Sequence, residues 1–161
     1  RLCKKILEYK MNIKNNNFIE YVKNNNNVLA IIIRESFSKE GIEFFTPDDY
    51  SQQVGYMRRP KGYRIKPHIH YQIPRTVSTL QEVLLIKKGK VRVDFYDAKK
   101  KYLISEILLK GDLIILVSCG HGFSMLEESE IIEVKQGPYM EEKDKEKFDS
   151  ISDDKIIMKR E

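Results

Sequence analysis

The chain has 161 residues, 41% of them hydrophobic, and a formal net charge of +5 at pH 7. This length predicts a single domain, and no apolar run approaches the ~18 residues that a membrane span needs. The 29 Lys and Arg residues are interleaved with 24 Asp and Glu residues, so we expect neither a nucleic acid nor a membrane as a partner.

The two cysteines, Cys3 and Cys119, lie far apart and do not form a disulfide framework. The basic start of the chain is not followed by the apolar segment of a signal peptide. These features favour a cytoplasmic location. The first residue is Arg1 rather than methionine, and we expect a chain that is trimmed or cut from a longer polypeptide.

Residues 1–27 are predicted to form a short N-terminal helical extension. Apolar residues at helical spacing precede two asparagine runs, and asparagine favours turns and caps over helix interiors. The apolar residues are Leu2, Ile6, Tyr9, Phe18, Tyr21 and Val22. We expect this extension to pack against the main domain or against a partner subunit.

Residues 28–140 are predicted to form an all-β domain. Many short apolar or alternating runs, separated by Gly, Pro and Asp and with little helix between them, indicate an antiparallel sandwich or a closed barrel. The runs at 82–86 and 91–96 flank Gly89 and predict a hairpin. The other expected strands are 28–33, 41–45, 53–57, 63–70, 102–109, 113–117, 123–126 and 131–136. Residues 141–161 are a highly charged tail, expected to be a solvated helix or a frayed end.

The three histidines of the chain share one pattern with a carboxylate. His68 and His70 are two apart in a predicted strand, so their side chains point to the same face. Glu82 begins the next predicted strand, which can run antiparallel beside the strand that carries His68 and His70. His121 comes from a distant strand, and closure of a barrel would bring it close.

Three imidazoles and one carboxylate suit a divalent transition metal such as Fe, Mn, Ni, Co, Cu or Zn. A six-coordinate ion with these four ligands keeps two positions for water, substrate or dioxygen, which is typical of a catalytic site. Two alternatives stay open for the histidines. They are either structural strand residues, or one of them acts as a general base in a pocket without metal.

Three further residues are candidates for binding a substrate. Arg75 lies in the segment before Glu82, where its guanidinium can clamp a carboxylate or phosphate. Glu133 and Lys135 share one face of a late strand. Ile132 and Val134 share the other face. If these two apolar residues pack outside, Glu133 and Lys135 face the cavity. If Ile132 and Val134 pack inside, Glu133 and Lys135 form an exposed ion pair.

These residues resemble the two motifs of the cupin superfamily. Gly62, His68, His70, Glu82 and Gly89 match the first motif, G-x5-H-x-H-x(3,4)-E-x6-G, except that eleven residues separate His70 from Glu82. Gly111 and His121 match the second motif, G-x5-P-x-G-x2-H-x3-N, which is here one residue short and lacks the Pro, the second Gly and the Asn. The resemblance covers about residues 40–140. It implies a double-stranded β-helix, or jelly-roll barrel, with a metal site in its mouth.

The sequence is similar to small bacterial cupins encoded among surface-polysaccharide and sugar-nucleotide genes. This resemblance implies a metal-dependent enzyme that acts on a small polar or anionic carbohydrate-type metabolite, and isomerase, epimerase and dioxygenase chemistry are all compatible with it. Alternatives are a non-catalytic metal- or ligand-binding module and a metal-independent sugar-nucleotide epimerase. We also expect a homodimer, because barrel edges are often protected by a second copy.

Overall fold

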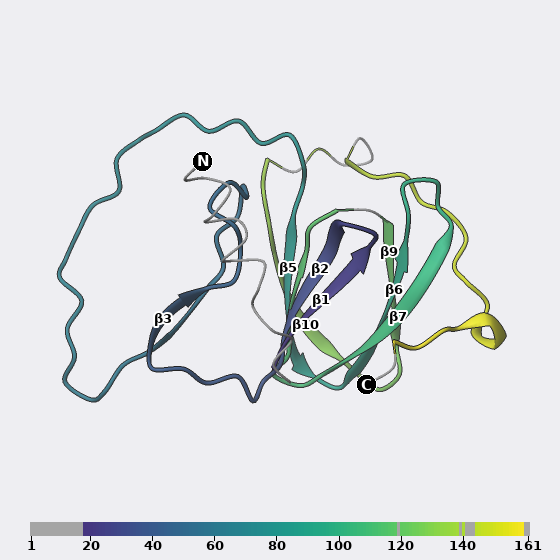
Figure 1. Cartoon of the computed structure of the whole chain (residues 1–161), viewed down its shortest axis with the longest axis horizontal. Helices are drawn as coiled ribbons and strands as arrows, with labels where there is room; N and C mark the ends of the chain where they lie inside the picture. The colour runs from purple at the N-terminus through teal and green to yellow at the C-terminus, as the bar shows by residue number, and fades with distance from the viewer. Residues whose placement is uncertain (1–17, 119, 139, 141–143, 160–161) are drawn as a thin grey trace.

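Two antiparallel sheets face each other across an apolar core, and a short hairpin packs on the outer face of the larger sheet (Figure 1). The computed structural model describes residues 18–118, 120–138, 140 and 144–159. The strands are β1 (Ile19–Asn24), β2 (Asn27–Ile33), β3 (Gly41–Phe44), β4 (Gly55–Arg58), β5 (Glu82–Lys88), β6 (Lys90–Tyr96), β7 (Tyr102–Leu109), β8 (Leu113–Leu116), β9 (Gly120–Met125) and β10 (Glu130–Lys135). The prediction of an all-β chain with antiparallel strands is therefore confirmed.

The larger sheet has five strands in the order β1-β2-β8-β5-β10, and the smaller sheet has three in the order β7-β6-β9. Strands β3 and β4 form the separate hairpin. Strands β9 and β10 are therefore edge strands of different sheets. Among the described residues, the structure has no helix with the length and apolar character needed to cross a membrane.

Strand β2 is apolar on both faces because each face lies against a different core. Ala30 and Ile32 point between the two sheets, whereas Ile31 and Ile33 pack with residues from and around the β3–β4 hairpin. Its partner β8 divides its side chains in the same way. Alternate side chains of a strand point to opposite faces, so two buried faces require the unbroken apolar run seen in the sequence.

The space between the sheets is filled by fully buried side chains from facing strands, among them Ile86, Val93, Phe95 and Leu108. Burial of one such side chain contributes about 1.5–3 kcal/mol. The chain crosses between the sheets at Gly89, whose φ of +86° favours glycine. The prediction of a hairpin at this glycine is wrong, because β5 and β6 follow one another in the chain but belong to different sheets.

The predicted N-terminal helix is wrong for residues 18–24. They form β1, which pairs with β2 through a tight turn at Asn25 and Asn26, and Asn25 has a φ of +53°. Asparagine tolerates this left-handed conformation and is favoured in hairpin turns, so the second asparagine run closes a hairpin rather than ending a helix. Residues 1–17 of the predicted extension lie outside the described residues.

The strand predicted at 63–70 is also wrong. These residues form an irregular, exposed stretch of the long connection between β4 and β5. The segment has the alternation of apolar and polar residues, but alternation produces a strand only where a neighbouring strand accepts its hydrogen bonds. The connection loops away from the sandwich beyond β3 (Figure 1).

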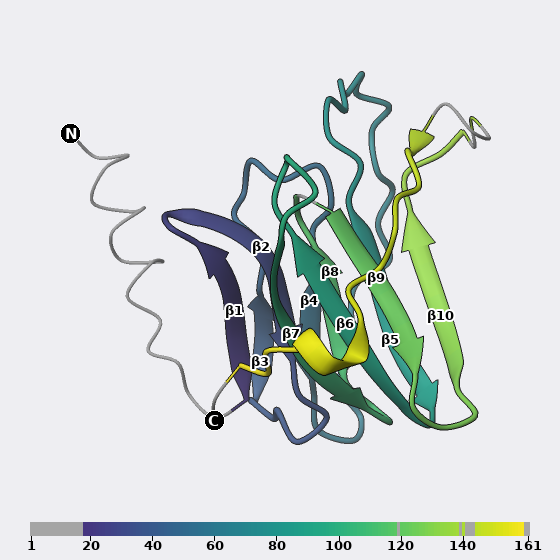
Figure 2. The ribbon, with the colours of Figure 1, turned by 90° about the vertical axis from the view of Figure 1, so that its right-hand side faces the viewer.

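The described part of the charged tail is anchored on the smaller sheet. It contains one short 3-10 turn, Asp153–Lys155, and runs across the sheet in Figure 2. Ser105 donates a backbone hydrogen bond to Ile157, and Lys159 donates one back to Ser105. Phe148 packs against Tyr96 with ring centroids 5.0 Å apart. Residues 144–159 are thus neither a solvated helix nor a frayed end.

Candidate functional site

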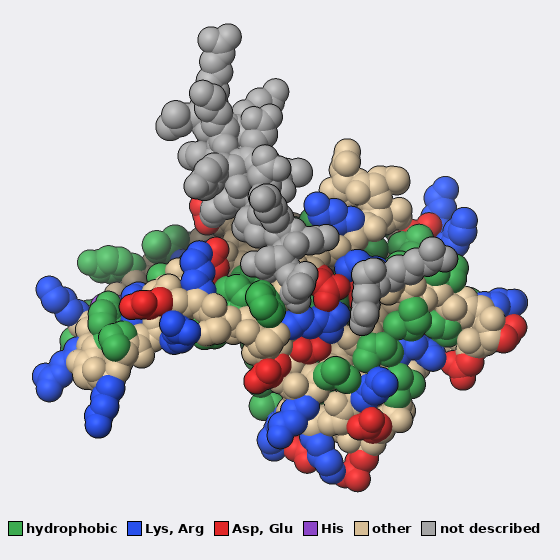
Figure 3. Space-filling model, turned by 60° about the horizontal axis from the view of Figure 1, so that its bottom comes forward, with side chains coloured by type: hydrophobic (Ala, Val, Ile, Leu, Met, Phe, Trp, Pro, Cys, Tyr) green, Lys and Arg blue, Asp and Glu red, His purple; other side chains and the backbone are tan. Residues whose placement is uncertain are grey.

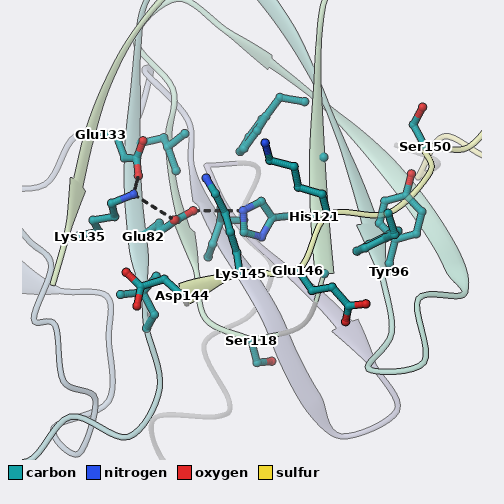
Figure 4. A pocket seen from close by; sticks show the side chains of 18 of the residues that line it. Glu82, Tyr96, Ser118, His121, Glu133, Lys135, Asp144, Lys145, Glu146 and Ser150 are labelled. Carbon is teal, nitrogen blue, oxygen red and sulfur yellow. Dashed lines mark ion pairs between the residues drawn. The ribbon is translucent and has the colours of Figure 1, made fainter. Parts of the chain in front are cut away.

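A cavity of about 790 Å³ opens between β5, β9, β10 and the tail (Figure 4). One part of its lining is apolar and includes Leu84, Leu116 and Phe123. The ionisable residues on its wall come from both sheets and from the tail. They are Glu82, Tyr96, His121, Glu133, Lys135, Asp144, Lys145, Glu146, Lys147 and Asp149. Such a cavity, with apolar walls and a few converging polar groups, is the usual form of a small-molecule site.

The central contact of the cavity joins His121 and Glu82. His121 pairs with Phe95 across β9 and β6, and its side chain points inward as Phe95 does. Glu82 is the first residue of β5, in the opposite sheet. The Nε2 atom of His121 lies 3.1 Å from Oε2 of Glu82, and both side chains are partly buried. The facing sheets therefore bring together two predicted metal ligands.

The surroundings of Glu82 favour its charged form. The hydrogen bond from His121 lowers the pKa of the Glu82 carboxyl below its ordinary value, although partial burial acts in the opposite direction. Electrostatic interactions with His121, Lys135 and Lys145 lower this pKa further. Glu82 is therefore held as a carboxylate, the form that binds a metal ion or accepts a proton.

Lys135 and Glu133 also face the cavity. Lys135 Nζ lies 3.0 Å from Glu133 Oε1 and 4.0 Å from Glu82 Oε1 (Figure 4). Ile132 and Val134 are on the other face of β10, where they are 50% and 56% exposed. Of the two arrangements that the sequence left open, the structure thus has the one in which the charged pair lines the cavity.

The structure does not bring His68 and His70 to this cavity. Both lie on the exposed β4–β5 connection, with their ring centroids 5.0 Å apart. The Nδ1 atom of His68 lies 3.0 Å from the backbone oxygen of Lys66. Within the described ranges, no group of three or more His, Cys, Asp or Glu residues is placed to hold a metal ion.

Arg75 likewise lies away from the cavity. Its side chain is on the exposed connection, and its guanidinium donates a long hydrogen bond of 3.4 Å to the backbone oxygen of Ile73. Of the seven predicted site residues, the single chain therefore gathers Glu82, His121, Glu133 and Lys135, and leaves His68, His70 and Arg75 outside.

The geometry of the central pair fits two ligands of one metal ion. Donor atoms about 2.1 Å from an ion and at right angles to each other are about 3.0 Å apart. The separation between His121 and Glu82 is 3.1 Å, which is compatible with two adjacent ligands of one ion and equally with the hydrogen bond described above. A complete site needs further ligands, and imidazoles such as those of His68 and His70 have the required chemistry.

The tail residues on the cavity wall were missed by sequence reasoning. Lys145 lies close enough to Glu82 to lower its pKa, and Phe148 lines the wall and packs against Tyr96. A signal was present in the sequence, because Phe148 is an aromatic residue within a run of charged ones. An isolated apolar residue in a charged segment often marks an attachment point.

The arrangement can bind a small polar molecule, exchange a proton through His121 and Glu82, and attract an anion through Lys135 and Lys145. Searches of family models, of curated proteins and of solved structures found no match to this chain. The function must therefore be inferred from the cavity and from the motifs in the sequence.

Proposed function

We propose that this chain is a metal-dependent enzyme of the cupin type that acts on a small polar or anionic carbohydrate-type metabolite. The observation that carries the proposal is the approach of His121 to Glu82, at 3.1 Å, in a cavity of about 790 Å³. These two residues stand at the ligand positions of the two cupin motifs, and they come from opposite sheets. Antiparallel strands in two facing sheets are compatible with the cupin barrel.

His121 and Glu82 would hold a divalent transition metal together with His68 and His70. Bound there, such an ion supplies Lewis-acid polarisation of a carbonyl or hydroxyl oxygen of the substrate. This role requires the β4–β5 connection to take a position other than the one in the single chain. The charged state of Glu82, which His121 favours, is the state that a divalent cation needs.

The other cavity residues would bind and orient the substrate. Lys135 can attract a carboxylate or phosphate, and Glu133, 3.0 Å away, holds its ammonium group at the wall. Phe123 provides apolar surface for the face of a sugar ring. The tail covers one side of the cavity and limits the access of water.

A metal-independent enzyme is a second candidate. In that case His121 exchanges a proton with the substrate, and Glu82 orients its imidazole and stabilises the imidazolium. The same 3.1 Å contact favours this candidate, because a base oriented by a carboxylate is a recurring arrangement in acid–base catalysis. The reaction class would then be an epimerisation or isomerisation by proton transfer.

Metal content separates the two candidates. The chain, purified without a histidine tag, is analysed by elemental mass spectrometry and by thermal unfolding with and without added Mn²⁺, Fe²⁺ or Zn²⁺. We expect close to one ion per chain and a raised Tm with the preferred ion, both lost in His121→Ala and weakened in Glu82→Gln. Glu133→Gln is the matched control, since it changes a neighbouring cavity carboxylate that is not a proposed ligand.

Two results would decide against the metal. One is a metal-free chain whose Tm does not respond to any of the three ions. The other is equal metal binding by wild type and His121→Ala. A chain that binds metal in the expected way, but turns over no sugar phosphate or sugar nucleotide in a substrate screen, would instead indicate the non-catalytic binding module.

A further inference from the structure

Residues 63–73 of the β4–β5 connection have the pattern of a strand without a sheet. Every odd position from 63 to 73 is apolar, and every even position from 64 to 72 is polar. Ile69 is 89% exposed and Tyr71 is 85% exposed. A period of two is typical of a strand with one buried face, and large exposed apolar surface marks an interaction site. We call residues 63–73 the projecting segment.

The two edge strands of the sandwich both line the cavity, and tail residues 144–150 line it beside them. β9 ends the three-stranded sheet and β10 ends the five-stranded sheet. Both contribute side chains to the cavity wall. An edge strand is a template for pairing with a further strand, so an added strand at β9 would extend the smaller sheet beside the cavity.

We propose that the projecting segment of a second copy of this chain pairs with the outer edge of β9 and completes the cavity. The second copy would thereby contribute His68 and His70 to a site that already holds His121 and Glu82. The pairing itself stands on the strand pattern and the edge of β9, whereas the metal-binding role of His68 and His70 rests on the function proposed above.

The faces of the two strands are complementary in an antiparallel register that sets His70 opposite His121. Directly opposite residues share a face of the sheet, so His68 falls beside Phe123, and both histidines face the cavity. On the other face, Ile69 falls beside Gly122. A strand with glycine there leaves room for a large neighbouring side chain.

A second copy is favoured over the same chain by the course of the connection. The projecting segment lies beyond β3, on the opposite side of β5 from β9 (Figure 1). Its apolar side chains are exposed in the single chain and make no sheet pairing among the described residues. Exchange of an identical segment between two copies buries this surface twice and forms two equivalent sites.

Charge supports the same register. The connection from Arg59 to Arg75 carries five basic residues and no acidic residue, and Lys and Arg side chains gather on the part that projects at the left of Figure 3. The turn that follows β9 carries exposed Glu127 and Glu128. With His70 opposite His121, Arg64 falls just beyond the end of β9, beside the turn that carries these two glutamates, so unlike charges lie near each other.

The oligomeric state tests the pairing independently of any metal. Light scattering and sedimentation are measured on the wild-type chain and on the double variant Ile69→Asp/Tyr71→Asp. We expect a dimer for wild type at micromolar concentration and a monomer for the variant. The far-ultraviolet circular dichroism and Tm of the variant chain at low concentration should remain those of a folded β protein, because both side chains are exposed in the single chain.

Ile157→Asp is the matched control, because Ile157 is an exposed isoleucine, 58% accessible, outside the projecting segment. It should remain dimeric. A wild-type chain that stays monomeric at tens of micromolar, or a double variant as dimeric as wild type, overturns the proposal.

A complementation experiment tests the shared site. A chain with His121→Ala and a chain with His68→Ala/His70→Ala are coexpressed with two different affinity tags other than histidine tags, and the heterodimer is purified through both. We expect each parent homodimer to bind no metal and the heterodimer to bind one ion. If each chain instead formed its site from its own segment, the heterodimer would contain no intact site and no metal.

The two experiments fail in different ways. If the proposed metal function is wrong, the wild-type chain binds no metal. It still forms a dimer, and Ile69→Asp/Tyr71→Asp still disrupts that dimer. A metal-binding wild-type chain whose heterodimer binds none would keep the proposed function and reject the exchange of segments.

Discussion

Glu82 and His121 belong to facing sheets, yet Oε2 of one and Nε2 of the other lie 3.1 Å apart. Within the sandwich, this contact is a polar bridge at the end of an otherwise apolar interior. Leu84, two residues after Glu82 on the same face of β5, is already in the core. The site thus begins where the hydrophobic packing of the two sheets ends.

The first prediction concerns the charge of Glu82. Glu82→Gln keeps the shape of the side chain and removes its negative charge. We expect metal affinity to fall by a factor of about 10–100, as is typical when an oriented ligand group is altered, while the Tm without metal changes little. Isothermal titration with Mn²⁺ or Zn²⁺ measures this change. An affinity equal to that of wild type would show that Glu82 is not a ligand.

The second prediction concerns the two glycines of the first motif, which have the same φ of +86°. A Cβ added at Gly89 would collide with the backbone oxygen of Glu128, whereas one added at Gly62 would meet nothing within 4 Å. Gly62→Ala should therefore cost about 1 kcal/mol or less, from backbone conformation alone. Gly89→Ala should lower the free energy of unfolding clearly more than Gly62→Ala does, because the backbone around Gly89 must shift. Urea unfolding of both variants gives the comparison, and equal costs would contradict it.

The third prediction concerns the ion cluster that anchors the end of the tail. Lys159 Nζ lies 3.0 Å from Glu20 and 3.1 Å from Glu106, and Arg34 also contacts Glu20. Burial opposes the charged form of Glu20, but hydrogen bonds from Arg34 and Lys159 lower its pKa from the ordinary 4.5. For Lys159, burial again opposes the charge, and the hydrogen bonds to the two glutamates raise its pKa above 10.5.

The signs of these shifts set the pH dependence of stability. Because the pKa of Glu20 is lowered in the folded chain, its contribution is present above its unfolded pKa, near 4.5, and is lost as pH falls through the folded value. Because the pKa of Lys159 is raised, its contribution is complete below about 10.5 and is lost as pH rises through the folded value. We expect Lys159→Met to cost on the order of 1–2 kcal/mol near pH 7 and to remove the alkaline loss. Urea unfolding from pH 3 to 11 tests both limbs, with exposed Lys155→Met as the control.

The fourth prediction concerns the attachment of the tail beside the cavity. Phe148→Ala removes the ring that packs on Tyr96 at 5.0 Å, at a cost of about 1–2 kcal/mol for a half-buried aromatic residue. The effect should be local, so that hydrogen exchange accelerates at the Ile151 amide, which donates to the Tyr96 hydroxyl, and not in the core of β6. Lys147→Ala is the control. Uniform acceleration throughout the sheet would mean that the tail is part of the global folding unit.

The strands that could be predicted from the sequence are those whose pattern follows from local burial. The run 28–33 is apolar without interruption because β2 lies between two cores, and the alternation in 91–95 follows from the inward positions of Val91, Val93 and Phe95. The run Asn24–Asn27 predicts a helix end but forms a hairpin turn, because asparagine favours both. Only the pairing with β2 decides between the two.

The candidate site was predictable in part. Glu82 and His121 were identified by spacing and motif, and the sandwich brings them into contact. His68 and His70 lie on an exposed stretch without sheet pairing among the described residues, because the alternation that predicts a strand does not say which neighbour would pair with it. Phe148 and Lys145 reach the cavity through contacts between distant parts of the chain, so the aromatic residue in the charged run marks a contact without showing what it packs against.

Strand β2 has a consequence for how the chain folds. Its neighbour on one side, β1, is adjacent in sequence, but on the other side Ile31 pairs with Ile115. The face of Ile31 and Ile33 can be covered early by residues 37–56, but most of the chain must be complete before the face of Ala30 and Ile32 meets residues 84–116. Pairings between distant residues slow folding and leave such strands exposed to aggregation. We expect yield to depend strongly on temperature and chaperones during expression, and the early β1–β2 hairpin is the element that most needs protection.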